Sequence, residues 1–189
     1  MILFLTGFMG SGKSSIGALA ARLAKAAFYD LDKYIEESTG KAVSRIFAEG
    51  GEALFRKAES ECLKGLISSL EGAAGLNIVA TGGGTPLAAE NSALLRSKGL
   101  CIYLKASAAY LADTLMRYPG DRPLLKGLVD KKSLQAKIEL MLQERSAKYE
   151  AAAHKIIEIG GKTCEEVAEE LGSLSFSAQG KAAEQGKSL

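Results

Sequence analysis

The chain has 189 residues, of which 47% are hydrophobic and 24% are charged, and this size and composition favour one soluble globular domain with a core of its own. The formal net charge is only +2, which argues against nucleic acid or an anionic membrane surface as a partner. The three cysteines, Cys62, Cys101 and Cys164, form no Cys-x-x-Cys pair, which argues against a disulfide framework or a zinc site and suits a reducing cytoplasm.

The first strand is expected at residues 2–6, a short apolar run followed by glycine. This run is too short for a secretory signal and has no basic residues before it, and no stretch approaches the roughly 18–20 apolar residues of a membrane span. The patterns that follow predict a helix, a strand, three helices and a strand, at residues 13–26, 28–31, 33–38, 43–48, 52–70 and 77–81.

The second half of the chain continues the alternation. It is expected to contain a helix, a strand, a helix, a polar loop, a long helix, a strand and a closing helix, at residues 86–96, 100–104, 108–117, 118–127, 131–152, 155–159 and 164–171. The Ser/Gly/Ala/Lys/Gln-rich segment 173–189 is predicted to be a disordered tail. Strands that alternate with helices predict one α/β domain over residues 1–172, a three-layer, doubly wound fold with a five-stranded parallel sheet.

A phosphate-binding loop lies between the first predicted strand and helix. Gly7-Phe8-Met9-Gly10-Ser11-Gly12-Lys13-Ser14 matches G-x-x-x-x-G-K-[ST] in the context that this motif requires. Its glycines let backbone N–H groups point inward, and the helix N-terminus adds partial positive charge. In such a loop the lysine contacts the β- and γ-phosphates and the final hydroxyl coordinates Mg²⁺. The loop predicts a bound nucleotide but not a reaction, because kinases, GTPases and non-enzymatic binders share it.

Two aspartates flank Leu31 at the end of the second predicted strand. A carboxylate beside the phosphate loop can hold Mg²⁺ or its waters, which suits Asp30. A second carboxylate can accept the proton of an attacking hydroxyl, which suits Asp32. The alternative is that one aspartate caps the next helix and the other lies in a turn.

Three glycines and three arginines are the remaining candidates. Gly82–Gly84 follows the third strand, at the edge of the sheet that carries the phosphate loop. Backbone N–H groups at this edge can bind an anion or a hydroxyl. The alternative is that the segment is only a flexible turn. Arginines such as Arg56, Arg122 and Arg145 can bind carboxylate or phosphate through paired hydrogen bonds. Arg56 could instead pair with Glu59, and Arg145 could be solvated surface. Arg122 lies in the Pro/Gly-rich loop, which could close over a transferring phosphate.

Taken in order, these motifs closely resemble the shikimate kinase family. The matching segments are Gly7-Phe8-Met9-Gly10-Ser11-Gly12-Lys13-Ser14-Ser15, Tyr29-Asp30-Leu31-Asp32, Ile46-Phe47-Ala48-Glu49-Gly50-Gly51-Glu52-Ala53-Leu54-Phe55-Arg56-Lys57-Ala58-Glu59, Ala80-Thr81-Gly82-Gly83-Gly84, Arg122-Pro123-Leu124-Leu125 and Arg145-Ser146-Ala147-Lys148-Tyr149. The resemblance implies a P-loop fold like that of nucleoside monophosphate kinases, with a substrate-binding helical segment over about 33–61 and a lid over about 113–127. It implies transfer of the γ-phosphate of ATP to the 3-hydroxyl of shikimate, on the route to chorismate and the aromatic amino acids.

The resemblance also implies a role for each candidate residue. The catalytic groups are Asp32, as the base, with Lys13 and Arg122. The substrate pocket consists of Asp32, Arg56, Gly82, Gly83, Gly84 and Arg145, with Glu59 orienting Arg56. The nucleotide is held by Gly10, Ser11, Gly12, Lys13, Ser14, Ser15, Arg117 and Arg122, with Lys162 as a weaker candidate, and Mg²⁺ by Ser14 and Asp30.

Three alternatives remain open. Another small-molecule P-loop kinase, such as one acting on gluconate, shares the loop and the lid, but the Asp30-x-Asp32, Arg56 and Gly82–Gly84 features argue against it. A nucleoside monophosphate kinase is disfavoured because the base-reading pattern is missing after the second strand. A non-catalytic nucleotide-binding homologue is expected to lack Lys13 or Asp32, which this chain has. We expect a cytoplasmic monomer that binds neither nucleic acid nor membrane.

Overall fold

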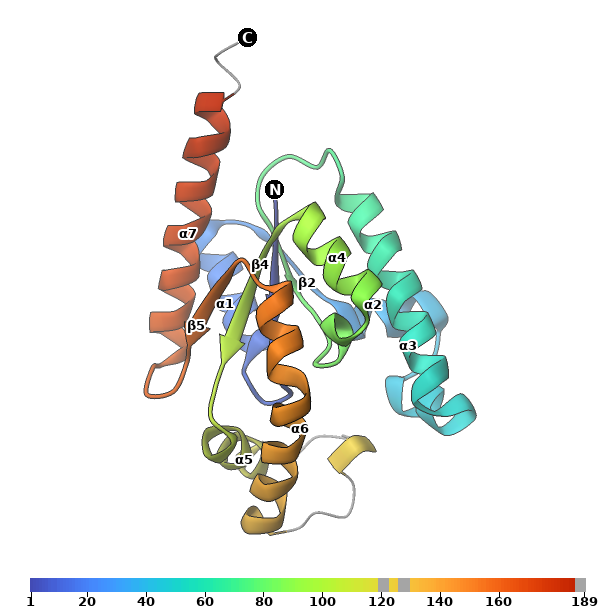
Figure 1. Cartoon of the computed structure of the whole chain (residues 1–189). Helices are drawn as coiled ribbons and strands as arrows, with labels where there is room; N and C mark the ends of the chain where they lie inside the picture. The colour runs from blue at the N-terminus through green and yellow to red at the C-terminus, as the bar shows by residue number, and fades with distance from the viewer. Residues whose placement is uncertain (119–122, 126–129, 186–189) are drawn as a thin grey trace.

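The computed structural model describes residues 1–118, 123–125 and 130–185. Its centre is a sheet of five parallel strands in the order β2-β3-β1-β4-β5 (Figure 1). The strands β1 to β5 span Ile2–Thr6, Ala27–Asp30, Asn77–Ala80, Leu100–Lys105 and Lys155–Glu158. The parallel five-stranded sheet that the sequence predicted is therefore confirmed.

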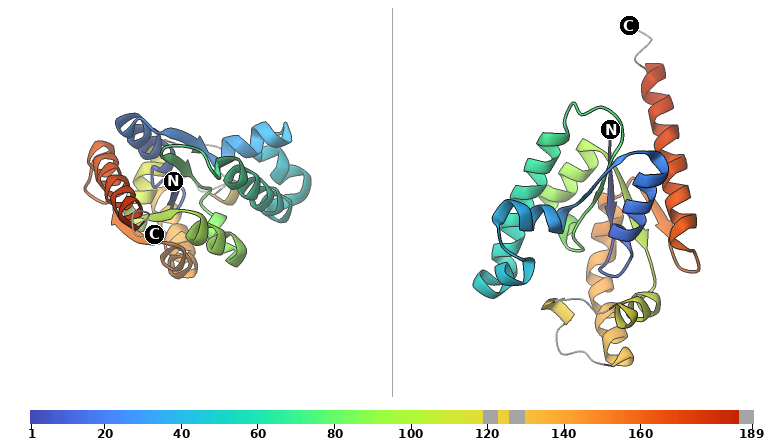
Figure 2. Two further views of the ribbon diagram at one scale, coloured as in Figure 1. Left: turned by 90° about the horizontal axis from the view of Figure 1, so that it is seen from above. Right: turned by 180° about the vertical axis from the view of Figure 1, so that it is seen from behind.

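Helices cover both faces of the sheet (Figure 1, Figure 2). On one face, α1 (Lys13–Ala24) packs against α7 (Cys164–Gln185). The opposite face carries α3, α4 and α6, which span Val43–Leu70, Ala89–Lys98 and Lys131–Ala152. The remaining helices, α2, α5, η1 and η2, span Leu31–Thr39, Ala108–Arg117, Thr85–Leu87 and Pro123–Leu125. In the part of the chain just described, no helix has the length and apolar character needed to cross a bilayer.

Alternation along the strands divides the core between the two faces. Leu3 and Leu5 of β1 pack in the cluster that contains residues of α1 and α7, whereas Ile2 and Phe4 pack with residues of α3 and α4. All five residues of β1 are buried, because a parallel strand covered on both faces has no solvent side. The continuous apolar run at the N-terminus follows from this position at the centre of the sheet.

Helix α3 contains a break at two glycines. Gly50 has φ −146° and ψ 15°, and Gly51 has φ 66° and ψ −164°, so neither is helical. Only glycine adopts the Gly51 conformation without strain. The break separates the two helices that the sequence predicted at 43–48 and 52–70, and it redirects the chain so that the second part packs against the sheet.

Two boundaries differ most from those expected. The helix predicted from residue 86 is a 3₁₀ turn over Thr85–Leu87, and α4 begins only at Ala89. The closing helix, expected to end at residue 171, continues as α7 to Gln185, and the disorder of the tail from 173 stays a prediction. The buried side chains of Val167, Ala168 and Leu171 dock the start of α7, and the Ala-, Gln- and Lys-rich sequence after them lacks a proline that would end the helix.

The strand order creates a crevice between β1 and β3. The chain leaves β1 through α1 on one face of the sheet, and leaves the adjacent strand β3 toward α4 on the other face. The two loops therefore diverge at the carboxyl ends of neighbouring strands, which is where open α/β sheets bind ligands. The loop after β1 is the phosphate loop and the loop after β3 is the glycine triplet, so the fold brings two of the predicted motifs together.

Candidate active site

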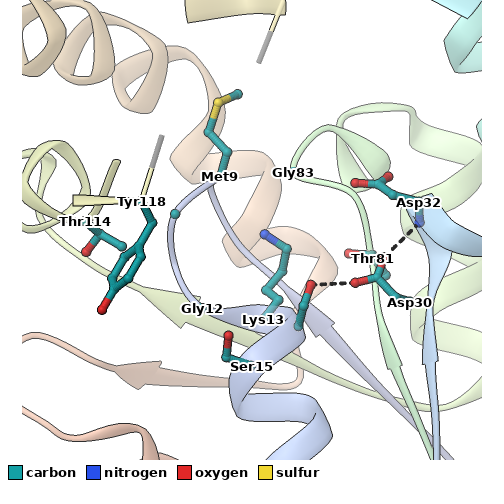
Figure 3. Close-up of a pocket in the computed structure, with 12 residues that line it drawn as sticks. Met9, Gly12, Lys13, Ser15, Asp30, Asp32, Thr81, Gly83, Thr114 and Tyr118 are labelled. Carbon is teal, nitrogen blue, oxygen red and sulfur yellow. Dashed lines mark hydrogen bonds between the residues drawn. The ribbon is translucent and has the colours of Figure 1, made fainter. Parts of the chain in front are cut away.

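A cavity of about 340 Å³ lies at this crevice (Figure 3). Its wall combines the phosphate loop and α1 with the ends of β2, β3 and α5. The lining residues are Met9, Gly10, Gly12, Lys13, Ser14, Ser15, Asp30, Asp32, Thr81, Gly83, Thr114 and Tyr118.

The phosphate loop wraps around the amino group of Lys13. Gly10 and Gly12 have φ of 84° and 78°, and Gly12 is the N-cap of α1. The buried Lys13 Nζ donates to the carbonyl oxygens of Gly7 and Phe8, at 2.9 and 3.1 Å. Within the loop, the Ser11 N–H donates to the Phe8 carbonyl at 3.1 Å. The loop therefore holds a cation beside the N-terminus of α1, an arrangement suited to a polyphosphate.

Asp30 links the end of β2 to the phosphate loop. Its Oδ2 accepts a hydrogen bond from the Ser14 hydroxyl at 2.5 Å, and its Oδ1 accepts one from the Asp32 N–H at 3.1 Å (Figure 3). Asp30 thus caps α2, as the alternative interpretation held, and it also faces the cavity. A hydroxyl and a carboxylate are hard oxygen donors of the kind that Mg²⁺ accepts, and magnesium sites beside phosphates need only one or two of them. The pair therefore fits a magnesium ion.

Asp32 projects into the cavity from the first turn of α2 (Figure 3). Burial of its carboxyl group, followed by the negative charge of Asp30, raises the pKa of Asp32 to about 6, although Lys13 and Arg56 act in the opposite direction. The residue keeps an exposed surface, so its carboxyl group is confined by protein but still reachable from solvent. A carboxylate with this pKa is ionised at neutral pH and is a stronger base than an ordinary aspartate.

Arg56 is held on α3 by two glutamates. Its guanidinium donates to Glu59 at 2.7 Å and to Glu52 at 3.0 Å. Glu59 is fully buried, and its other oxygen accepts a hydrogen bond from Thr85 at 2.6 Å. Burial lowers the pKa of Arg56, but the charges and hydrogen bonds of the two glutamates outweigh that effect and raise it. The predicted pairing with Glu59 is present, and it fixes the direction of the guanidinium.

The glycine triplet lies directly against these charged groups. A Cβ on Gly82 would lie 2.5 Å from Glu59 Oε1 and 3.2 Å from Asp32 Oδ1. A Cβ on Gly84 would overlap the guanidinium of Arg56. Glycine is therefore required here by close approach, and the triplet lies against both Asp32 and Arg56.

We expect Gly84→Ala to raise the KM of the acidic substrate by about 10- to 100-fold, because the added methyl group displaces the guanidinium by a distance on the order of 1 Å. The control is Gly65→Ala in α3, whose added methyl group would meet only the Tyr34 hydroxyl, at 3.6 Å. Steady-state kinetics on both variants checks this. Equal KM values for the two variants would contradict the steric argument.

Arg145 approaches the same region from α6. Its Cζ lies 5.9 Å from the ring centroid of Phe8 in the phosphate loop, and the residue is half-buried. Its side chain also forms a hydrogen bond with the Tyr149 hydroxyl, which acts to lower the pKa of that group. The charge of Arg56 acts on the pKa of the same hydroxyl, so both arginines lie in the neighbourhood of Tyr149.

Other predicted residues are not brought to the cavity. Arg117 is exposed at the end of α5 and does not line the wall. Lys162 forms an ion pair with Glu170 at 2.7 Å. Arg122 and most of the predicted lid lie outside the described residues. Ser11 belongs to the loop, but its side chain is buried and does not line the wall.

Four residues of the wall were not among the predicted site residues: Met9, Thr81, Thr114 and Tyr118. Thr114 of α5 and Tyr118, the residue that follows this helix, line the cavity beside the phosphate loop (Figure 3). They are four residues apart, and the Tyr118 N–H donates to the Thr114 carbonyl at 2.9 Å, so they lie one helical turn from each other. That spacing, immediately before the Pro/Gly-rich loop, was the available signal.

Comparison with known proteins gives consistent matches. A family model described as shikimate kinase matches residues 9–174. A shikimate kinase of Chlorobium luteolum is 42% identical over 156 residues, which cover 80% of this chain and 74% of that protein. One of Flavobacterium psychrophilum is 39% identical over 173 residues, which cover 91% of this chain and 97% of that protein. The structure of the shikimate kinase from Acinetobacter baumannii in complex with shikimate superposes with a TM-score of 0.82 at 30% identity, covering 94% of this chain and 93% of that chain.

Proposed function

Because the chain belongs to the shikimate kinase family, we propose that it transfers the γ-phosphoryl group of ATP to the 3-hydroxyl of shikimate, giving shikimate 3-phosphate and ADP. Shikimate carries a carboxylate and several hydroxyl groups. A site for it needs a cationic clamp for the acid, a base beside one hydroxyl and an adjoining phosphate cradle.

One arrangement supports the proposal: a carboxylate, two arginines and the phosphate loop adjoin one another. Asp32 and Lys13 line the same cavity. Asp32 and the Glu59–Arg56 pair meet at Gly82, and Arg145 lies against the phosphate loop. An alcohol held by its acid group at the arginines would therefore lie beside Asp32, facing a triphosphate in the loop.

Each residue then has a role in phosphoryl transfer. Asp32 accepts the proton of the attacking hydroxyl, while Arg56 and Arg145 hold the carboxylate so that the hydroxyl points at the phosphorus. Lys13 balances charge on the phosphate oxygens. Ser14 and Asp30 would hold Mg²⁺, which when bound would supply further charge neutralisation. Arg122 is proposed to stabilise the transferring phosphoryl group, as part of a lid that excludes water.

The test is ADP release by the purified protein with Mg²⁺ and ATP. We expect rapid release with shikimate, and slow release with gluconate or with no acceptor. Release that gluconate stimulates and shikimate does not would favour the gluconate-type alternative. Release that no acceptor stimulates, despite tight ATP binding, would favour a non-catalytic homologue.

Removing the Ser14 hydroxyl tests the magnesium assignment. We expect Ser14→Ala to raise the Mg²⁺ concentration needed for half-maximal activity by about 10- to 100-fold, because a metal-site oxygen is lost. The control is Ser97→Ala in α4, whose hydroxyl bonds only to its own helix, at 3.3 Å from the Leu94 carbonyl. A magnesium titration at saturating ATP measures the effect, and superimposed curves would refute the assignment.

The monomeric state, the cytoplasmic location and the lid over about 113–127 remain predictions. Size-exclusion chromatography with light scattering tests the first of these. We expect a mass near 19.9 kDa.

A further inference from the structure

Tyr149 of α6 connects elements of the site without lining the cavity. It is fully buried, and its hydroxyl donates to the Gly83 carbonyl oxygen at 2.5 Å. Gly83 is the middle residue of the glycine triplet. Its α-carbon approaches the phosphate loop so closely that a Cβ there would lie 3.1 Å from the Met9 nitrogen. The Tyr149 hydroxyl thus anchors a turn that touches the phosphate loop on one side and the charged residues on the other.

The surroundings of Tyr149 keep its hydroxyl in the donor form. Burial raises the pKa of Tyr149 to about 12, against the opposing influence of Arg145. The phenol is therefore protonated throughout the neutral range and can donate to the carbonyl. Its ring stacks on Tyr103 of β4, with centroids 5.1 Å apart and planes at 26°, which fixes the position of the hydroxyl.

Two cations lie near this hydroxyl. Arg145, one turn earlier on α6, makes a side-chain hydrogen bond to it, and the charge of Arg56 is close enough to act on it. These are the two arginines to which the substrate carboxylate is assigned. One phenol therefore touches the turn that packs against Arg56 and also restrains Arg145.

We propose that Tyr149 is a positioning residue for substrate: its hydroxyl fixes the Gly82–Gly84 turn and Arg145 relative to Arg56, and so sets the affinity for the acid group of the phosphoryl acceptor. This inference rests on the proposed function for the identity of that acceptor. Tyr149 does not line the cavity, so it is expected to act through its neighbours.

The chain offers a matched control in the other member of the stacked pair. Tyr149→Phe and Tyr103→Phe each keep the ring and delete a buried hydroxyl, but the Tyr103 hydroxyl interacts with Ser146 and not with the glycine turn. We expect Tyr149→Phe to raise the KM for shikimate by about 5- to 20-fold, the equivalent of one hydrogen bond. The KM for ATP should change less than about twofold, and Tyr103→Phe should leave both constants within about twofold.

A second readout does not depend on the acceptor. Amide hydrogen exchange over residues 79–88, measured without ligand, should be accelerated by Tyr149→Phe and unchanged by Tyr103→Phe. Faster exchange with an unchanged KM for shikimate would overturn the positioning role. Equal effects of the two variants on the KM for shikimate and on hydrogen exchange would show that Tyr149 only packs in the core. If the unmodified protein fails to phosphorylate shikimate, the proposed function is wrong. The exchange measurement remains informative in that case, because equal exchange rates in the two variants would show that Tyr149 does not anchor the turn.

Discussion

The Asp32→Asn variant is expected to bind both substrates and to lose about 10²- to 10⁴-fold in kcat, the range attributed to general base catalysis. The amide keeps the size of the side chain and its place in the first turn of α2, but it cannot accept the proton of the attacking hydroxyl. Glu37→Gln, in an exposed position of the same helix, is the matched control and should retain the activity of the unmodified protein.

The pKa of Asp32, about 6, also predicts the pH dependence. The base must be ionised, so kcat/KM should rise with pH up to about 6 and then level off, and Asp32→Asn should lack this rise. A residual rate with the same pH profile in the variant would assign the base to another group.

The same carboxylate should cost folding stability at neutral pH. Its pKa is raised from 3.8 to about 6, so between these values the folded state binds more protons than the unfolded state. Stability therefore falls as pH rises through this window and stays reduced above it. Asp32→Asn should have a higher Tm than the unmodified protein at pH 7.5, and the difference should shrink toward pH 4. Differential scanning calorimetry across this range measures both.

Arg56→Ala is expected to produce the largest loss of substrate affinity. Truncating one member of a buried, hydrogen-bonded ion pair costs about 2–5 kcal/mol, which corresponds to roughly 30- to 5,000-fold in the KM for shikimate. The loss also leaves the fully buried Glu59 without its partner, and its uncompensated negative charge should repel the acid group of the substrate. The dissociation constant of ATP, measured by calorimetry, should change little, because Arg56 does not line the cavity beside the phosphate loop.

The same helix supplies the control for Arg56. Arg45 pairs with Glu49 at 2.9 Å, but its side chain is 69% exposed, and such a surface pair contributes at most about 1 kcal/mol. Arg45→Ala should therefore leave the KM for shikimate unchanged. If Arg56→Ala has the same KM for shikimate as Arg45→Ala, Arg56 stabilises α3 and does not bind the substrate. The same conclusion holds if Arg56→Ala weakens the binding of ATP as much as the binding of shikimate.

Local sequence was sufficient for the parts of the site that lie within a few residues of one another. The phosphate loop needs only glycines, a lysine and a serine between a strand and a helix, and the structure shows that conformation. The break in α3 was likewise predicted at Gly50–Gly51, where the backbone leaves helical geometry. The Asp30 cap is equally local, because it joins residues two positions apart.

Contacts between distant segments were decided only by the tertiary structure. The order of the strands places the loop after β3 beside the loop after β1, and this brings Gly82 to Asp32 and Gly84 to Arg56. The sequence marked these residues as separate candidates without showing that they touch, and it gave no sign of the Tyr149–Gly83 hydrogen bond. It also misplaced the end of α7.

The physical reason for this division is the range over which each interaction acts. Backbone preferences and caps depend on neighbouring residues, so the amino-acid sequence by itself determined the phosphate loop, the succession of strands and helices and the membership of the family. Burial, charge and hydrogen bonds between segments more than 20 residues apart depend on which strands become neighbours. The raised pKa of Asp32, the contact of Gly84 with the Arg56 guanidinium and the anchoring of the glycine turn therefore arise only when the sheet has formed.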